Sequence, residues 1–304
     1  MKIKKFLLNP FIVFSFLASK GKLLFISEKL MVKLIYRGQM GKKLNLKNPK
    51  TFNEKMQWLK VYDHNPLYTK LVDKHEVREF VRTIIGEKYL IPELKLWDSP
   101  KEINLEELPN KFVIKCTHDS GSVLVIRNKD KIEQDSLIKH FLKRTKRSHY
   151  WAGREWPYKN VKPRIIVEQY LETDGEGGLK DYKFYCFNGV PMFLYVSSGL
   201  DNHETAKISF FDLDGNRMPF GRSDYNPIDY KIEMPSKFEE MKKIASVCAS
   251  EIGADFVRVD LFEVNNRVFF SEFTFTPCGG YMPFSPEDYD EIIGELLKLT
   301  KKDK

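Results

Sequence analysis

The chain has 304 residues, a length typical of about two domains of ordinary size. Hydrophobic residues make up 42% of the chain and charged residues 30%, which argues against both a disordered chain and a membrane-spanning bundle. The cysteines lie far apart and form no CxxC pair: Cys116, Cys186, Cys248 and Cys278. This spacing argues against a disulfide framework or a thiolate zinc site, and predicts reduced cysteines in a cytoplasmic protein.

Positive charge is concentrated at the N-terminus. Residues 1–50 contain twelve Lys and Arg against one acid, Glu28, whereas the rest of the chain contains 38 Lys and Arg against 41 Asp and Glu. A protein that binds nucleic acid usually carries a basic stripe on its folded body. The charge distribution therefore predicts no nucleic-acid partner.

The N-terminal segment combines apolar and basic residues. Residues 6–19 carry no charge, but about 20 residues are needed to span a bilayer and Pro10 interrupts the run. Ala18-Ser19-Lys20 is a poor signal-peptide cleavage site, so we expect an uncleaved segment. Residues 22–37 have the pattern of a basic amphipathic helix. We expect residues 1–45 to bind an anionic membrane surface, with the alternative that these helices pack on the protein body.

Further along the chain, local patterns predict helices and then strands. Thr51 and Glu54 fit a capping box at the start of a helix, and Gly86 is expected to end a later one. Short apolar runs bounded by turn residues predict strands, which we expect to form antiparallel hairpins. A long helix is expected before the last two strands. The expected strands are 89–97, 111–116, 123–126, 164–171, 182–187, 192–197, 255–263 and 267–275, and the helix is 234–252.

The last hairpin contains a set of polar residues at alternating positions. Arg258 and Asp260 share one face of the first strand, and Glu272 and Thr274 share one face of the second. Pairing across the Asn265-Asn266 turn would bring them together. Two carboxylates and an oxygen donor suit Mg²⁺, and the arginine could neutralise phosphate. The alternative is a solvated outer face.

A lysine interrupts an apolar strand at residue 115. Burying Lys115 is costly unless an anion meets it. The following turn, Ser120, Gly121 and Ser122, could present backbone N–H groups to a phosphate. The alternative is an edge-strand lysine followed by an ordinary turn.

The next strand ends in an acid and leads into a glycine-rich loop. Glu168 lies near the end of the β-branched run, before the loop at 175–178, where a carboxylate and a backbone edge could contact an adenine. Asp181 and Lys183 then open another strand and share one of its faces.

This ordered set resembles the ATP-grasp superfamily and, more narrowly, the TupA-like ATP-grasp family of polysaccharide-associated amide ligases. The similarity covers roughly residues 48–295 and depends on the order of individually weak motifs. The motifs are Pro49–Lys55, Leu71–Lys74, Phe112–Cys116, Arg154–Tyr158, Ile166–Glu168 and Glu272–Pro277.

The resemblance implies an α/β (α+β) ATP-grasp fold with mixed antiparallel sheets, preceded by a helical basic segment. It divides the chain into basic amphipathic N-terminal helices, a region before the ATP-grasp fold, a lid or small subdomain, and a C-terminal subdomain with the metal site. The corresponding ranges are 1–47, 48–103, 104–180 and 181–304.

The resemblance also implies roles for individual residues, with ATP and Mg²⁺ as cofactors. Arg258 would face an acyl-phosphate and Lys183 would approach phosphate, as the catalytic pair. Thr274 stands where many relatives have Asn, which leaves the third metal ligand open. Phosphate would contact Lys115, Ser120, Gly121 and Ser122. Adenine would contact Glu168 and the backbone near Leu171, and ribose would contact Asp181, with Glu172 as the competing residue. Mg²⁺ would be bound by Asp260, Glu272 and Thr274.

The implied activity is an ADP-forming carboxylate–amine ligation through an acyl-phosphate. From the family, the partners would be an amino acid and a uronic acid or other sugar of a bacterial-type surface polysaccharide, small or lipid-linked. The protein would then be cytoplasmic, with a peripheral position on the inner face of the cytoplasmic membrane as a further expectation.

Other functions remain open. Asp212 and Asp214 form the Asp-x-Asp that some glycosyltransferases use, although Asp214-Gly215 is also typical of a hairpin turn. An ATP-grasp kinase and an inactive nucleotide-binding module are further alternatives. No HExxH, GxxxxGK[ST] or GxGxxG motif occurs, which argues against zincin, P-loop and Rossmann proteins. Lys74 could serve the site or be a solvated lysine on a helix face, and His118 could contact phosphate or shape its loop. The 151–158 aromatic cluster could face a substrate or pack within the lid subdomain.

Overall fold

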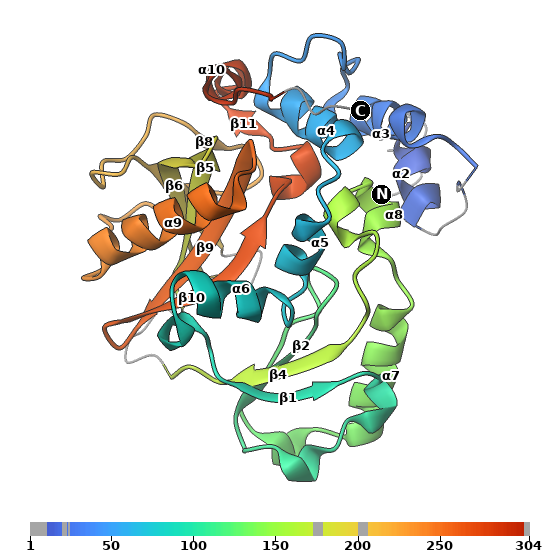
Figure 1. The fold of residues 1–304 in the computed structure, drawn as a ribbon, viewed down its shortest axis with the longest axis vertical. Coiled ribbons are helices and arrows are strands. Elements are labelled where there is room, and N and C mark those ends of the chain that lie inside the picture. The colour runs from blue at the N-terminus through green and yellow to red at the C-terminus, as the bar shows by residue number, and fades with distance from the viewer. Residues whose placement is uncertain (1–10, 20–22, 24, 173–178, 200–205, 301–304) are drawn as a thin grey trace. The chain divides into compact units, whose positions relative to one another are not determined.

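The computed structural model describes residues 11–19, 23, 25–172, 179–199 and 206–300 (Figure 1). The expected glycine-rich loop at 175–178 and the first lysines of the chain lie outside these residues. The chain forms two compact units. Unit 1 comprises residues 1–44, 60–78 and 91–171, and unit 2 comprises residues 45–59, 79–90 and 172–304.

Unit 1 contains a four-stranded antiparallel sheet in the order β1-β4-β2-β3. Phe112 and Ile114 of β2 lie in a core that also includes Phe141 of α7. Because β2 pairs with both β4 and β3, Lys115 lies on an interior strand, and the edge-strand alternative is wrong. The strands are β1 (Glu93–Trp97), β2 (Phe112–Cys116), β3 (Leu124–Ile126) and β4 (Ile165–Gln169), and α7 is Gln134–Thr145.

The N-terminal helices also belong to unit 1. Helix α3 (Glu28–Met40) begins after Ser27, whose Oγ accepts a hydrogen bond from the Leu30 N–H at 3.4 Å, later than the predicted start at 22. Its apolar face is buried, α2 (Ile12–Ser19) packs against α3 and α8 (His149–Gly153), and the Tyr150 hydroxyl donates to Glu28 at 2.9 Å. The described helices thus pack on the body of unit 1. Within the described residues, no helix has the length and apolar content to cross a membrane.

Unit 2 contains a five-stranded antiparallel sheet in the order β10-β9-β5-β6-β7. Asn265 and Asn266 join β9 to β10 with φ of 50° and 60°, the left-handed conformation that tight hairpins require. The strands are β5 (Asp181–Phe187), β6 (Val190–Ser198), β7 (Lys207–Phe211), β9 (Phe256–Val264) and β10 (Arg267–Thr274).

Both faces of this sheet are covered. Helix α9 (Phe238–Ile252) packs on one face, where Phe238 stacks on Phe184 (Figure 1). The helix ends just before Gly253, as predicted, but it begins four residues later than expected. On the other face, Tyr185 belongs to an aromatic cluster with Phe52. Since strand β5 is buried on both sides, its polar residues lie in a low-dielectric environment.

The beginning of α4 (Phe52–Tyr62) confirms the predicted capping box. The Glu54 N–H donates to Thr51 Oγ1 at 3.2 Å, and the Thr51 N–H donates to the Glu54 carboxylate at 3.4 Å. The apolar run expected to form one helix before Gly86 is divided at Asp73, whose carboxylate accepts from the N–H groups of the next turn. The remaining helices are α5 (Leu67–Val72), α6 (Val77–Ile84) and α10 (Tyr289–Leu296), and the remaining strands are β8 (Gly221–Arg222) and β11 (Phe284–Ser285).

Candidate functional site

The polar residues of the last hairpin meet those of β5 inside unit 2. The strand register pairs Lys183 with Asp260, and Asp260 with Glu272. Lys183 Nζ lies 2.7 Å from Asp260 Oδ2 and 3.1 Å from the Asp181 carboxylate. Arg258 donates to both Asp260 oxygens, through Nε at 2.7 Å and Nη2 at 2.6 Å. The structure therefore brings together five of the predicted site residues.

These groups do not form a solvated outer face. Asp260 is 0% exposed and Arg258 is buried, so the outer-face alternative is wrong for them. Toward the edge of the sheet, Glu272 is half-buried with Oε1 3.6 Å from Arg258 Nη2, and Thr274 Oγ1 accepts a hydrogen bond from the same nitrogen at 3.0 Å. Charge-assisted contacts of this kind are the strong ones when water is excluded.

Burial and the neighbouring charges shift the pKa values in opposite directions. Burial raises the pKa of Asp181, and Lys183 only partly offsets it. Burial also disfavours the charge on Asp260, but Arg258 and Lys183 outweigh burial and lower its pKa. Although burial opposes the Lys183 charge, Asp181 and Asp260 raise its pKa. Asp260 is therefore held as an anion between two cations, and Asp181 is the carboxyl that most readily keeps a proton.

The oxygen donors in this cluster are of the type that binds Mg²⁺, and the strand register places them next to one another. Asp260 and Glu272 are directly paired across β9 and β10, and Thr274 adds a hydroxyl on the same face. A magnesium ion would share Asp260 with the two cations already in contact with it. Over the residues that the structure describes, no group of three or more His, Cys, Asp or Glu side chains suited to a metal occurs, so the candidate comprises two carboxylates and one hydroxyl.

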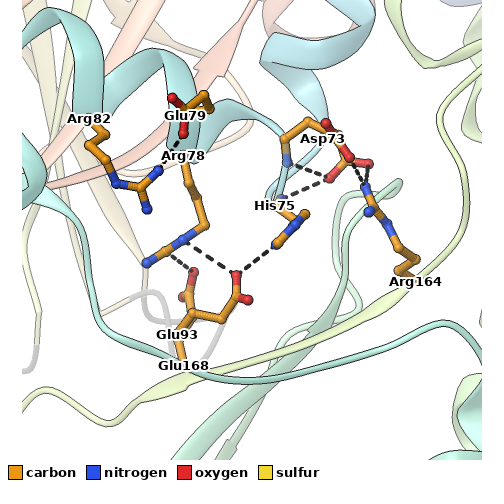
Figure 2. Close-up of polar contacts among 9 residues, drawn as sticks. Asp73, His75, Arg78, Glu79, Arg82, Glu93, Arg164 and Glu168 are labelled. Atoms are coloured by element: carbon orange, nitrogen blue, oxygen red, sulfur yellow. Dashed lines mark hydrogen bonds and ion pairs between the residues drawn. The ribbon is translucent and has the colours of Figure 1, made fainter.

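Unit 1 holds a second cluster, around the strand lysine. Lys115 Nζ lies 2.6 Å from Glu168 Oε2, and the two residues are diagonal neighbours on β2 and β4. In the structure, the anion that Lys115 contacts is thus the carboxylate of Glu168, the residue that the family resemblance assigns to adenine. Arg78 of α6 approaches the other oxygen of Glu168 at 3.9 Å (Figure 2).

The turn after β2 is held by its own side chains. Gly121 has φ of 84°, and the buried Ser122 hydroxyl donates to Asp119 while accepting from the Cys116 N–H at 2.9 Å. Lys74 Nζ donates to the Asp119 carbonyl at 2.6 Å, so Lys74 braces this turn. The Ser122 hydroxyl is therefore used inside the turn, and what this turn offers a ligand is its backbone, as the sequence predicts for a phosphate.

The remaining predicted residues lie near the ends of strands. Leu171 follows the end of β4, where the Gln169 N–H already donates to the Pro92 carbonyl at 2.9 Å. His118 is buried with Nε2 3.2 Å from the Arg147 carbonyl oxygen, and burial lowers its pKa. Unit 1 and unit 2 thus each contain one cluster of predicted site residues.

The 151–158 segment packs within unit 1. The Arg154 guanidinium lies 4.4 Å from the Trp151 ring centroid and donates to the Leu23 carbonyl at 3.3 Å. Lys60 donates to the Gly153 carbonyl at 2.9 Å, and Glu155 lies 3.1 Å from His149. These contacts support the packing interpretation of the aromatic cluster.

The Asp-x-Asp segment forms a turn. Asp212 Oδ1 accepts from the Asp214 N–H at 3.0 Å and from the Asn216 N–H at 2.8 Å, and Gly215 has φ of 84°. The hairpin-turn interpretation is confirmed.

Two residues in contact with the unit 1 cluster are missing from the sequence prediction, Arg78 and Glu93. Arg78 lies four residues after Lys74, but nothing in the local sequence distinguishes it from Arg82. Glu93 opens a strand, yet the chain alone does not indicate which strand it faces.

The family model described as TupA-like ATPgrasp matches residues 54–298. A search of curated proteins found no match. Among solved structures, D-alanine–D-alanine ligase from Bacillus anthracis complexed with ATP is 15% identical with a TM-score of 0.38, over 67% of this chain and 53% of that one. The corresponding enzyme from Helicobacter pylori is 15% identical with a TM-score of 0.40, over 75% and 61%.

A further solved structure is the ATP-grasp ligase PsnB, complexed with a phosphomimetic variant of its minimal precursor, Mg and ADP. It is 11% identical with a TM-score of 0.42, over 82% of this chain and 59% of that one. The chain thus spans between half and two thirds of the length of these structures. The assignment to a family comes from the family model, which covers most of the chain.

Proposed function

Because this chain belongs to the TupA-like ATP-grasp family, we propose that it is an ADP-forming carboxylate–amine ligase. The observation that carries the proposal is the buried cluster in unit 2, where Lys183 and Arg258 flank Asp260 and Glu272 is its cross-strand partner. Such a set of fixed charges is suited to stabilising a phosphoryl group during transfer.

ATP and Mg²⁺ are the proposed cofactors. Asp260 and Glu272 would hold Mg²⁺, with Thr274 as a further oxygen donor. Bound there, the ion would neutralise phosphate charge. In unit 1, Lys115 and the backbone of the turn after β2 would contact phosphate, while Glu168 and the backbone near Leu171 would contact adenine. Asp181 would contact the ribose.

The proposed reaction balances without a nucleophilic side chain. A carboxylate oxygen of the first substrate attacks the γ-phosphorus, the bond to ADP breaks, and an acyl-phosphate forms. The amine of the second substrate then attacks the carbonyl carbon, loses a proton and expels phosphate, which keeps one of the carboxylate oxygens. Arg258 would stabilise the negative charge of the acyl-phosphate, and alignment of the two substrates would supply much of the rate enhancement.

The substrates follow from the family and not from the geometry. We propose an amino acid and a uronic acid or other sugar of a surface polysaccharide, free or lipid-linked. The proposed location is cytoplasmic, with a peripheral position at an anionic membrane. The +11 charge of residues 1–50 supports this location, as do the exposed apolar side chains of Phe16, Phe25 and Leu30 and the exposed Lys29.

The ligase proposal is tested by a screen of amino acids against uronic-acid sugars for phosphate release from ATP. The expected result is release that requires both substrates and yields a new amide, detected by mass spectrometry. A stable phosphorylated sugar would indicate a kinase and contradict the proposal. Transfer from a nucleotide-sugar without ATP would indicate a glycosyltransferase.

The membrane proposal is tested separately, by sedimentation with vesicles. Wild-type protein should sediment with anionic but not neutral vesicles and should be released by high salt, because screening weakens the charge attraction. Phe16→Ser with Phe25→Ser should reduce sedimentation. Equal sedimentation with neutral vesicles, or none with anionic ones, would contradict the membrane location and leave the ligase proposal intact.

A further inference from the structure

Two carboxylates lie opposite each other in the unit 1 sheet. Glu93 of β1 and Glu168 of β4 are direct cross-strand partners. Like charges in this arrangement repel. Arg78 separates them: its Nε lies 3.4 Å from Glu93 Oε2, and its Nη1 lies 3.9 Å from Glu168 Oε1 (Figure 2).

Glu168 therefore has a different cation at each of its oxygens. Lys115 meets Oε2 at 2.6 Å and Arg78 approaches Oε1, while the Glu168 side chain is only 8% exposed. The local charges balance, with two carboxylates against Arg78 and Lys115. Glu93 in turn is held by His75, whose Nδ1 lies 2.9 Å from the carboxylate (Figure 2). The Arg78 guanidinium thus lies between two carboxylates, Glu93 on one side and Glu168 on the other.

A phosphate that draws Lys115 away would change this balance. Glu168 would keep its negative charge in a largely buried position, and an unpaired buried charge is strongly unfavourable. Arg78 is the cation that remains beside it. In contrast, a ligand without phosphate would leave the Lys115–Glu168 pair intact and would place no such demand on Arg78.

We propose that Arg78 is a positioning residue for nucleotide binding, which retains the Glu168 carboxylate when Lys115 turns from it to a phosphate. This inference rests on the proposed function, because it takes Lys115 as a phosphate contact. The proposed role is specific: Arg78 acts through Lys115, and it matters for ATP and not for adenosine.

The test is a double-mutant cycle on ATP affinity, measured by calorimetry with Arg78→Ala, Lys115→Ala and the double variant. Arg78→Ala should weaken ATP binding about tenfold, which corresponds to about 1.4 kcal/mol, and should change adenosine binding less than about twofold. Added to Lys115→Ala, it should have no further effect on ATP affinity. Arg78→Lys should restore most of the affinity, because an ammonium group can also lie between the two carboxylates.

Arg82 provides the matched control on the same helix. It pairs with Glu79 at 2.5 Å, its side chain is 42% exposed, and it lies one turn beyond Arg78 (Figure 2). Arg82→Ala removes the same charge, so it should leave ATP affinity within about twofold of the wild type. If Arg78→Ala does not fold, Arg78→Gln replaces it in the same cycle.

The outcomes separate this inference from the proposed function. If Lys115→Ala weakens ATP binding but Arg78→Ala does not, the inference is wrong and the ligase proposal stands. Equal losses for ATP and adenosine, or additive losses in the double variant, would show a structural role and also overturn it. If the wild-type protein does not bind ATP, the proposed function fails, and the inference fails with it.

Discussion

Each unit holds a salt-bridge cluster in which a strand lysine and an arginine face one carboxylate, yet the clusters differ in how firmly that carboxylate is held. In unit 2, Asp260 is fully buried and receives close contacts from Arg258 and Lys183. In unit 1, the Glu168 side chain is 8% exposed and has one close cation, Lys115, and a second, Arg78, at 3.9 Å. We therefore infer that the unit 2 charges are prearranged, whereas Lys115 of unit 1 can turn from Glu168 to another anion.

The largest expected effect is on the stability of unit 2. Asp260→Asn leaves Lys183 and Arg258 without their shared anion, and breaking a buried pair in this way costs about 3–5 kcal/mol. Denaturant unfolding should show this loss, and phosphate release should disappear. Asp229→Asn is the control, because Asp229 pairs with Lys207 at 2.7 Å but its side chain is 70% exposed. That change should leave the free energy of unfolding nearly unchanged, because an exposed ion pair is screened by solvent. Equal losses of stability in the two variants would contradict the comparison.

The unit 1 pair should affect binding more than stability. Lys115→Ala should weaken ATP binding about tenfold or more, because it removes a charge-assisted contact worth about 1.5–3 kcal/mol, while Arg78 still lies beside Glu168. Lys95→Ala is the control, since Lys95 lies on β1 of the same sheet in an exposed pair with Glu107. Unchanged ATP affinity in a folded Lys115→Ala variant would remove this lysine from the site.

How much of these clusters could be predicted depends on whether the signal is local. The alternation from Arg258 to Thr274 and the Asn265-Asn266 turn are local, so the hairpin and its shared face were predictable and are confirmed. The burial of that face was not predictable, because the aromatic cluster on the same face of the sheet includes residues from distant parts of the chain, such as Phe52.

Less of the unit 1 cluster could be predicted, because more of its contacts join distant parts of the chain. The need of Lys115 for an anionic partner could be predicted, because a lysine in an apolar strand is costly to bury without one. Its connection to Arg78 depends on contacts between segments that are far apart in sequence, so the residues carry no local sign of it. The two-residue strands β8 and β11 exist only through their mutual pairing, and were missed for the same reason.

Two buried lysines have pKa values shifted in opposite directions, so the pH dependence of stability tests the comparison further. Contact with two carboxylates raises the pKa of Lys183, whereas burial lowers the pKa of Lys60 to about 8, despite Glu155 nearby. Between pH 8 and about 10.5 the folded state has released the Lys60 proton while the unfolded state still holds it, so stability rises with pH in this window. Relative to Lys60→Met, the wild type should gain about 1 kcal/mol in unfolding free energy between pH 7 and 9.

Chemical denaturation of both proteins at the two pH values measures this difference directly. A constant difference would mean that Lys60 does not titrate in this range. A difference that grows in favour of the Met variant as the pH rises would contradict the assigned direction of the pKa shift.

The smallest expected effect lies at the Asp-x-Asp turn. Asp212→Asn and Asp214→Asn should leave phosphate release within about twofold of the wild type, because Asp212 caps its own turn and such surface changes cost little. Steady-state assays of both variants provide the measurement. Loss of turnover in these variants, with Asp260→Asn unaffected, would favour the glycosyltransferase alternative.

The most direct test of the ligase proposal follows the carboxylate oxygen. The wild-type protein is incubated with ATP, Mg²⁺, an amino acid and a uronic acid, with ¹⁸O in the carboxylate of each substrate in turn. Transfer through an acyl-phosphate predicts one labelled oxygen in the released phosphate and one in the new amide, for one of the two labelled substrates. Phosphate that carries no label with either substrate would contradict the proposed ligation.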